Sequence, residues 1–304
     1  MERRVFDGGM FAVGVFHAIP GDGLWSRPIR MGDRGSLLVF PKTAVRITPF
    51  GVDSVVANTT NVILYDPGRE HRRDVVDPAG DHCVFVGLAP VHLAEVATRF
   101  DPEASSQDPA TFSFPGMFAP TDPHTVLLER QIERHLASPF VDPLLVEETL
   151  CRVVERSMRN AYLLWDRAPA PPRPGTARMH AELAEAAAEV LSTSFRERRS
   201  LPELAREVLA SPFHLARVFR SRTGSSLHAY RTQLRLRSAL DRLCDPGLNL
   251  TDLALESGFS SHSHFTDAFR SAFGAAPSRI RSVARSASLR EMRTFLEARL
   301  RSVP

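Results

Sequence analysis

The stretch Ser211-Pro-Phe-His-Leu-Ala-Arg-Val-Phe-Arg-Ser-Arg-Thr-Gly224 decides the fold of the last third of this chain, because the chain repeats it. Four positions recur fifty residues later: Ser211, Leu215, Phe219 and Gly224 correspond to Ser261, Phe265, Phe269 and Gly274. A Leu-Ala pair precedes each copy, at Leu204-Ala205 and at Leu253-Ala254. The last third therefore contains one structural unit twice.

Each copy predicts a helix, a tight turn and a second helix. Ser211 and Ser261 are good N-caps, because a serine hydroxyl accepts a hydrogen bond from a backbone N–H. The second helix buries its apolar residues at i and i+4 and leaves its other face free. Gly224 and Gly274 lie where a helix ends in the left-handed conformation. Each copy is therefore predicted to be a helix-turn-helix.

A long helix is predicted between the two copies. Its apolar face consists of Leu227, Tyr230, Leu234, Ala239, Leu240 and Leu243, and its arginines are Arg231, Arg235, Arg237 and Arg242. Such a helix would hold two recognition helices about one DNA turn apart, roughly 34 Å, so that one chain reads two adjacent major-groove segments. Periodicity alone fits an ordinary helical bundle equally well, and the paired motif favours DNA binding.

At these residues the sequence resembles the AraC/XylS family of bacterial transcription regulators. The similarity runs from about Ser200 to Arg281, roughly a quarter of the chain. It rests on Leu201-Pro-Glu-Leu-Ala, Ser211-Pro-Phe-His-Leu-Ala-Arg-Val-Phe-Arg, Leu250-Thr-Asp-Leu-Ala, Gly258-Phe-Ser-Ser-His-Ser-His-Phe, Phe269-Arg, Phe273-Gly and Pro277-Ser. One departure is Leu209, where the family often has glycine, and we expect it to alter the first turn slightly.

The resemblance implies which residues of the first recognition helix face the bases. These positions are Phe213, Ala216 and Arg217. An arginine can donate two hydrogen bonds to guanine, and the other two side chains can touch thymine methyl groups. Arg217 is the main candidate, with a phosphate contact or an intramolecular ion pair as its alternative roles.

On the second recognition helix the corresponding positions are His262, Ser263, Thr266 and Asp267. The family often has a base at position 267, and a carboxylate there is repelled by phosphates unless it accepts a hydrogen bond from cytosine or pairs with Arg270. We therefore expect this half to bind DNA less tightly. Expected contacts to the DNA backbone are Arg220, Arg222, Arg231, Arg235 and Arg270.

The first ninety residues contain short apolar segments separated by turns, which predicts a small all-β sandwich or barrel. The expected strands are Phe11 to Phe16, Gly35 to Phe40, Ala44 to Ile47, Val55 to Ala57, Asn61 to Tyr65 and Cys83 to Leu88. Helical periodicity begins after Val91, so two or three helices follow, which pack on their own domain or form a dimer interface. This order of elements resembles the family's cupin-like sensing domain.

The predicted fold class is α+β: an N-terminal cupin-like β-barrel with following helices, then an all-α domain of two helix-turn-helix units joined by a long helix. The proline-dense stretch Ala168-Pro-Ala-Pro-Pro-Arg-Pro-Gly cannot hold a helix and marks the domain boundary. The predicted domains are a cupin-like sensing or dimerisation domain at 1–165, a Pro-rich linker at 166–178, an AraC-type DNA-binding domain at 179–285 and a C-terminal helical extension at 286–304.

Composition limits the class of protein. The 304 residues contain no apolar run near the ~20 residues that span a bilayer and no secretory signal, so neither membrane insertion nor export is expected. The three cysteines, Cys83, Cys151 and Cys244, lack paired spacing, which favours a reduced, cytoplasmic compartment. From His180 onward the chain has 19 Arg against 13 acidic residues, a weak indication of a polyanionic partner.

The predicted function is a sequence-specific transcriptional regulator that binds promoter DNA through its two helix-turn-helix motifs and is controlled by a signal at its N-terminal domain. No enzymatic activity, cofactor or metal is expected. The expected partner is double-stranded DNA, while RNA polymerase, a small-molecule effector, a homodimer and the choice between activation and repression stay open. Candidate effector-binding residues inside the barrel are Arg46, Tyr65, Glu70, His71, Arg72 and His82.

Two alternatives belong to other classes: a cupin-type metal-dependent enzyme and a protein-interaction module with a helical tail. The His-x-His of the chain, His262-Ser-His264, lies on a predicted helix, where residues i and i+2 diverge by about 200° and do not easily grip one metal. Glu70-His71 and His82-Cys83 flank a predicted hairpin and could bring metal-type ligands together, although isolated His and Cys side chains in a sheet are more often packed or hydrogen-bonded. No P-loop, Gly-x-Ser-x-Gly or Gly-x-Gly-x-x-Gly motif is present.

Overall fold

The fold is described from a computed structural model of the chain. It describes residues 2–25, 27–32, 35–51, 53–101, 103–104, 108, 112–139, 141–165 and 174–286. These residues belong to two compact units. The first unit lies within 1–121, 154–194 and 199–230, and the second within 122–153, 195–198 and 231–304.

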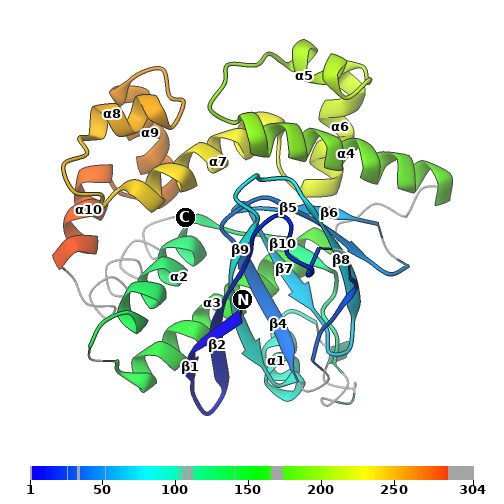
Figure 1. Ribbon diagram of the computed structural model, residues 1–304, viewed down its shortest axis with the longest axis vertical. Coiled ribbons are helices and arrows are strands. Elements are labelled where there is room, and N and C mark those ends of the chain that lie inside the picture. Colours follow the sequence, from blue (N-terminus) through cyan, green and yellow to red (C-terminus); the bar gives the residue numbers. More distant parts are fainter. Residues whose placement is uncertain are drawn as a thin grey trace. The chain divides into compact units, whose positions relative to one another are not determined.

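Two antiparallel sheets form the front of the chain, inside the first unit (Figure 1). Their strand orders are β1-β2-β9-β4-β7-β10 and β3-β8-β5-β6. The strands are β1 (Glu2–Asp7), β2 (Phe11–Ala18), β3 (Ile29–Arg30), β4 (Ser36–Pro41), β5 (Val45–Pro49), β6 (Val55–Ala57), β7 (Asn61–Tyr65), β8 (Glu70–Val75), β9 (Asp81–Leu88) and β10 (Phe118–Pro120). The predicted mixture of a β-rich front and a helical rear is confirmed.

The six predicted strands are all present. In the described residues they belong to two open sheets, each ending in strands with one neighbour, so of the predicted sandwich or cupin-like barrel the closed barrel is not confirmed. Strand β8 escaped prediction because its sequence, Glu-His-Arg-Arg-Asp-Val, is almost entirely polar. Only His71 and Arg73 of this strand are buried. The predicted hairpin between Glu70-His71 and His82-Cys83 is also wrong, since β8 and β9 belong to different sheets.

Helices make up most of the remainder. They are α1 (Pro90–Ala97), α2 (Pro123–Leu136), α3 (Pro143–Trp165), α4 (Pro174–Ser194), α5 (Leu201–Glu207), α6 (Pro212–Thr223), α7 (Leu227–Arg242), α8 (Leu250–Glu256), α9 (His262–Phe273) and α10 (Pro277–Ser286). The predicted long helix between the repeats is α7, and the helix ends predicted at Gly224 and Gly274 are confirmed. No helix of the described segments is long and apolar enough to cross a membrane.

Helix α4 begins at Pro174, inside the stretch 166–178 that was expected to be a Pro-rich linker. A proline is tolerated in the first helical turn, where the N–H that it lacks would have no partner within the helix. The structure describes only the first residue, 286, of the predicted C-terminal extension at 286–304, and residues 287–304 lie outside the described residues. Both domain boundaries stay predictions.

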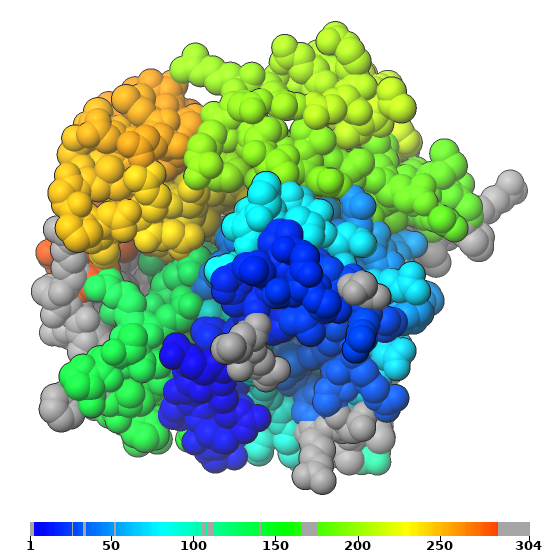
Figure 2. Space-filling view, in the orientation of Figure 1, coloured from blue at the N-terminus to red at the C-terminus, as the bar shows by residue number. Residues whose placement is uncertain are grey.

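Within the first unit, α4 lies against the edge of the smaller sheet and against α6 (Figure 2). Alanines dominate the buried face of α4: Ala181, Ala184, Ala187 and Ala188. Small side chains let a helix approach its neighbours closely. Polar residues of this helix, Glu185 and Glu189, therefore contact strand β5.

Candidate functional site

The first helix-turn-helix consists of α5 and α6, and each helix has a side-chain cap. Ser200 and Glu203 form a capping box at the start of α5, in which each side chain accepts a hydrogen bond from the other residue's backbone N–H. Ser211 accepts a hydrogen bond from the backbone N–H of His214 at 3.3 Å. Gly224 ends α6 with a φ of 71°, so the predicted N-cap and left-handed terminus are both confirmed.

Helix α6 has one buried and one exposed face. Leu215 and Phe219 are fully buried, and the Phe219 ring makes an edge contact with Tyr230 of α7, with centroids 5.1 Å apart. On the other face Phe213 is 89% exposed and Arg217 is exposed. Arg217 lies 3.3 Å from the Nδ1 atom of His214, one turn earlier on the helix.

The base-facing positions predicted on α6 therefore lie on one side of the helix. Arg217 and Arg220 are exposed, and Ala216 is partly buried. A large apolar side chain such as Phe213 gains nothing from 89% exposure to water, because its burial would be worth about 1.5–3 kcal/mol. Its contact with DNA stays a prediction.

The second helix-turn-helix, α8 and α9, repeats the same construction in the second unit. Asn249 caps α8, Ser261 caps α9 through the backbone N–H of His264 at 3.1 Å, and Gly274 ends α9 at a φ of 70°. Three stacked phenylalanines fill its inner face: Phe265, Phe269 and Phe273, with ring centroids 5.4 and 4.4 Å apart.

The outer face of α9 differs in charge from that of α6. His262, Ser263 and Asp267 are exposed, whereas Thr266 is partly buried. The Asp267 carboxylate lies 3.7 Å from the guanidinium of Arg270, and both side chains are more than half exposed. The Asp267–Arg270 pair, one of the two alternatives considered for this carboxylate, is therefore present, although a pair this exposed and this long contributes little to stability.

The turns of the two copies have the same hydrogen bonds. In the first, the N–H of Leu209 bonds to the Arg206 carbonyl and that of Ala210 to the Ala205 carbonyl; the second turn repeats this with Gly258 and Phe259. Leu209 has a φ of 53° and Gly258 a φ of 88°. The leucine thus takes the left-handed conformation that glycine favours, and the expected change in turn shape is not observed.

One predicted DNA-backbone contact is wrong. Arg235 is 8% exposed, and its guanidinium donates to the carbonyl oxygens of Phe195 at 2.6 Å and Glu197 at 2.8 Å. Burial lowers its pKa to about 10, so the side chain remains charged at neutral pH. Arg235 therefore stabilises the segment before α5 instead of facing a phosphate.

The front sheet contacts α4 and α6 through polar side chains. Arg46 of β5 pairs with Glu185 of α4 at 2.5 Å and also with Glu189, and Ser54 donates to Glu185. Asp53 pairs with Arg222 of α6 at 3.1 Å. These contacts link the front sheet to α4 and α6 within one compact unit.

Asn58, which follows β6, adds a buried contact to the same link. Its side-chain amide donates to the hydroxyl of Tyr230 at 2.5 Å and to the hydroxyl of Ser192 at 2.8 Å. Asn58 is 2% exposed and Tyr230 is 5% exposed. Because Tyr230 also packs on Phe219, this hydrogen bond connects the sheet to the buried face of α6.

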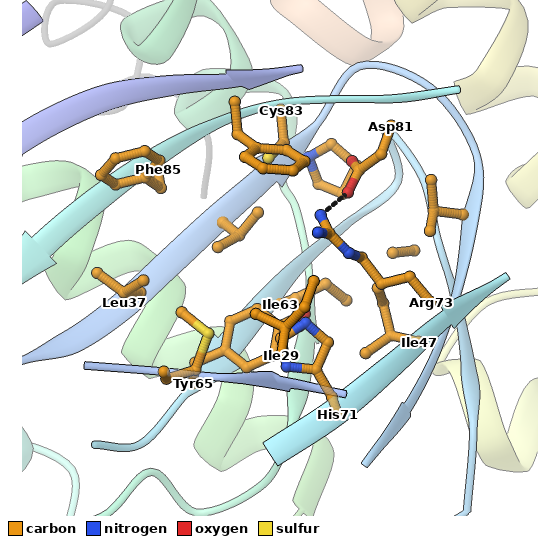
Figure 3. Close-up of a pocket in the computed structure, with 16 residues that line it drawn as sticks. Ile29, Leu37, Ile47, Ile63, Tyr65, His71, Arg73, Asp81, Cys83 and Phe85 are labelled. Carbon is orange, nitrogen blue, oxygen red and sulfur yellow. Dashed lines mark hydrogen bonds and ion pairs between the residues drawn. The ribbon is translucent and has the colours of Figure 1, made fainter. Parts of the chain in front are cut away.

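A cavity of about 130 Å³ lies between the two sheets (Figure 3). Its wall contains residues of β2 to β9, and most of them are apolar: Phe16, Ile29, Met31, Leu37, Val39, Pro41, Val45, Ile47, Ala57, Ile63 and Phe85. The polar or ionisable residues of the wall are Tyr65, His71, Arg73, Asp81 and Cys83. The cavity therefore has an apolar interior with a few polar groups, as small-molecule sites commonly do.

Two of the six predicted effector-binding residues, Tyr65 and His71, line this cavity. The other four do not, because side chains alternate between the faces of a strand. Arg46 lies between Val45 and Ile47, which face the cavity; Arg72 lies between two cavity residues of β8, and His82 between two of β9. Glu70 lines a neighbouring cavity of about 240 Å³.

Sequence reasoning missed Arg73 and Asp81, which form an ion pair of 2.5 Å at the cavity wall. Two opposite charges on neighbouring short segments were the available signal, but only the packing of the two sheets against each other places them together. In the described part of the chain no cluster of three or more His, Cys, Asp or Glu side chains is arranged to hold a metal.

Comparisons with known proteins find a helix-turn-helix domain in the part of the chain that contains the two repeats. Residues 204–282 match a family model described as a helix-turn-helix domain. The transcriptional regulator GlxA of Rhizobium meliloti is 35% identical over 94 residues, 31% of this chain and 29% of its own length. The transcriptional activator RhaS of Yersinia pestis is 33% identical over 92 residues, 30% of this chain and 34% of its own length.

Among solved structures, ToxT of Vibrio cholerae aligns with 90% of this chain and 97% of its own, at 10% identity and a TM-score of 0.38. The chain spans about a third of the length of the curated relatives named here. The matched segment contains both turns, both recognition helices and the connecting helix α7. Residues 204–282 therefore form a helix-turn-helix domain similar to those of AraC/XylS-type transcription regulators.

Proposed function

We propose that the whole chain is a sequence-specific transcription regulator that binds promoter DNA with α6 and α9. The observation that carries the proposal is the pair of capped helices, each with a buried apolar inner face and an exposed outer face. Residues 179–285 are the DNA-binding domain in this proposal, and residues 1–165 are a cupin-like sensing domain.

In this proposal α6 supplies most of the specificity. Arg217 donates two hydrogen bonds to one guanine, while Phe213 and Ala216 contact thymine methyl groups in the same groove. Arg220 lies one turn after Ala216, is exposed, and binds a phosphate. The histidine beside Arg217 accepts from the guanidinium in the free protein and gives up that contact to the base.

Helix α9 is the weaker reader. Its exposed Asp267 brings a negative charge towards the phosphates, and its partner Arg270 is only partly neutralised by it at 3.7 Å. Hydrogen bonds from His262 and Ser263 supply contacts near the helix N-terminus, where partial positive charge favours a phosphate. The two halves of the operator are therefore read unequally.

The front half senses a signal, and strand β5 is the route to the DNA-binding helices. Val45 and Ile47 face the cavity, while Arg46 between them is paired to Glu185 and Glu189 of α4. A ligand changes DNA binding only if it has different affinities for two arrangements of the protein. A shift of β5 on ligand binding would act directly on these ion pairs.

The test is selection of binding sites from a random double-stranded DNA library by the purified full chain, followed by titration of the selected site. Arg217→Ala should lose about 1–3 kcal/mol, roughly fivefold to 150-fold in affinity, and should relax the sequence preference at one guanine. Arg99→Ala is the matched control, because Arg99 is exposed and pairs with Glu155 in the front half. No enriched sequence, or equal losses in the two variants, would contradict the proposal.

A further inference from the structure

His71 lines the cavity between the sheets, and together with Tyr65 it also lines the neighbouring cavity of about 240 Å³. His71 is 3% exposed, and within the described part of the chain its Nδ1 atom has no hydrogen-bond partner. Its ring packs on that of Tyr65, with centroids 4.7 Å apart, and the two side chains lie next to each other at the wall (Figure 3). An unsatisfied buried group costs about 1–3 kcal/mol, which makes this atom the natural anchor for a ligand.

The charges of the cavity are already neutralised by one another. Arg73 and Asp81 pair at 2.5 Å, and their side chains are each 8% exposed. The guanidinium also lies over the Phe16 ring, 4.3 Å from its centre. A carboxylate ligand would have to displace Asp81 from Arg73, and an ammonium would have to displace Arg73 from Asp81. Either exchange leaves an unpaired buried charge, which is strongly unfavourable.

The histidine adds no charge of its own. Burial, assisted by repulsion from Arg73, lowers the pKa of His71 to about 4, so the imidazole is neutral at pH 7. Burial also raises the pKa of Tyr65 above its ordinary value, so that side chain stays a phenol. A neutral imidazole has one donor and one acceptor nitrogen, and a hydroxyl group can serve as partner to either one.

The size of the cavity sets the size of the ligand. Its volume is about 130 Å³, and an engineered apolar cavity of about 150 Å³ is large enough for benzene. Apolar side chains of both sheets surround this space. We propose that the cavity binds a neutral molecule about the size of one six-membered ring, with an apolar body and a single hydroxyl group that bonds to His71.

Calorimetric titration of the full chain at neutral pH with phenol, toluene and benzoate tests this inference. The three probes share one ring and differ in a hydroxyl, a methyl and a carboxylate. Phenol should bind about threefold to tenfold more tightly than toluene, as one net hydrogen bond predicts, and benzoate should bind more weakly than both. Benzoate binding as tight as phenol, equal binding of phenol and toluene, or no binding of phenol would overturn the inference.

His71→Phe keeps a ring against Tyr65 and removes both nitrogens. This variant should retain toluene binding and lose the preference for phenol. His82→Phe is the matched control, because His82 points away from the cavity on β9, and it should keep the preference. A preference that survives in His71→Phe would contradict the anchor. Circular dichroism verifies folding, and if His71→Phe does not fold, the three probes on the wild-type chain decide the question alone.

The inference rests on the proposed function only in treating the bound molecule as an effector. The binding-site selection uses no ligand, and the calorimetric titration uses no DNA. DNA binding without phenol binding would refute the ligand class and leave the regulator intact. Phenol binding without DNA binding would refute the proposed regulator and leave the ligand class intact.

Discussion

The two helix-turn-helix copies share their backbone and differ in what surrounds it. Their caps, left-handed ends and turn hydrogen bonds are the same. In the second turn, a Cβ atom on Gly258 would lie 2.7 Å from the Arg196 carbonyl oxygen and 3.0 Å from the Arg235 Nε. The first turn faces open solvent, and Leu209 there is 94% exposed. Glycine is therefore a steric requirement in one copy and only a conformational preference in the other.

The outer faces differ in the same way. The repeat fixes which residues of α6 and α9 are buried, and it leaves the exposed positions free to diverge. One copy has Arg217 where it can meet a base, and the other has Asp267. Duplicated folds thus keep their packing residues while their recognition residues change, because only the packing residues determine whether the unit folds.

The largest effect is expected from Gly258→Ala. The left-handed conformation costs a residue with a Cβ about 1–2 kcal/mol, and overpacking against Arg196 adds about 1–3 kcal/mol. The free energy of unfolding of the second unit should fall by roughly 3 kcal/mol, measured by urea denaturation. Ala210→Gly is the control in the open first turn and should cost much less. A loss for Gly258→Ala below about 1 kcal/mol would show that Arg196 moves aside.

Asp267→Asn tests the unequal reading of DNA by the two copies. Removing the carboxylate ends its repulsion from phosphates and releases Arg270, so affinity for the selected site should rise about threefold to tenfold. Fluorescence anisotropy at several salt concentrations measures the change. Glu256→Gln, an exposed carboxylate on α8 that pairs with Arg242, is the control. A fall in affinity would instead show that Asp267 accepts a hydrogen bond from a base.

Leu209→Gly should remove strain from the first turn. The leucine has a φ of 53° and buries almost nothing, so glycine relieves about 1–2 kcal/mol and returns part of it as backbone entropy. We expect a net gain of about 0.5–1 kcal/mol in thermal or urea unfolding. Leu255→Gly, in an exposed helical position of α8, should be destabilising by about 1 kcal/mol. Weaker DNA binding by Leu209→Gly would indicate that the exposed leucine contacts the DNA.

Asp53→Asn tests a contact that α6 makes with the front sheet. The Asp53–Arg222 pair is about one-third exposed on each side, so it is worth at most about 1 kcal/mol. Releasing Arg222 for a phosphate should raise DNA affinity by about twofold and steepen its salt dependence slightly. Asp7→Asn removes an exposed carboxylate that pairs with Arg4 on β1, and it should leave both quantities unchanged. Unchanged affinity in Asp53→Asn would show that Arg222 does not contribute to binding.

Local sequence was enough to predict the DNA-binding third. Its signals are caps, a left-handed glycine and apolar residues at i and i+4, each of which acts within a few residues. The front half was harder, because a strand depends on distant neighbours. Strand β8 reads as a polar loop, yet pairing with β3 and β5 makes it the centre of a sheet. The candidate DNA-reading residues came from the repeat and the resemblance, and they stay predictions.

The sequence by itself determined the duplication, the positions of the helices around it and the family of the C-terminal third, because these depend on local hydrogen bonding and helical periodicity. The tertiary structure alone decided which side of each strand faces the cavity. It therefore decided that Arg73 lines the cavity and Arg72 does not, and that Arg46 points away from the cavity while its two neighbours face it. It also decided that Arg235 donates hydrogen bonds to backbone carbonyl oxygens, and that Gly258 packs too closely on Arg196 to leave room for a Cβ atom. Burial of a side chain depends on residues far away in the chain, and no local pattern contains that information.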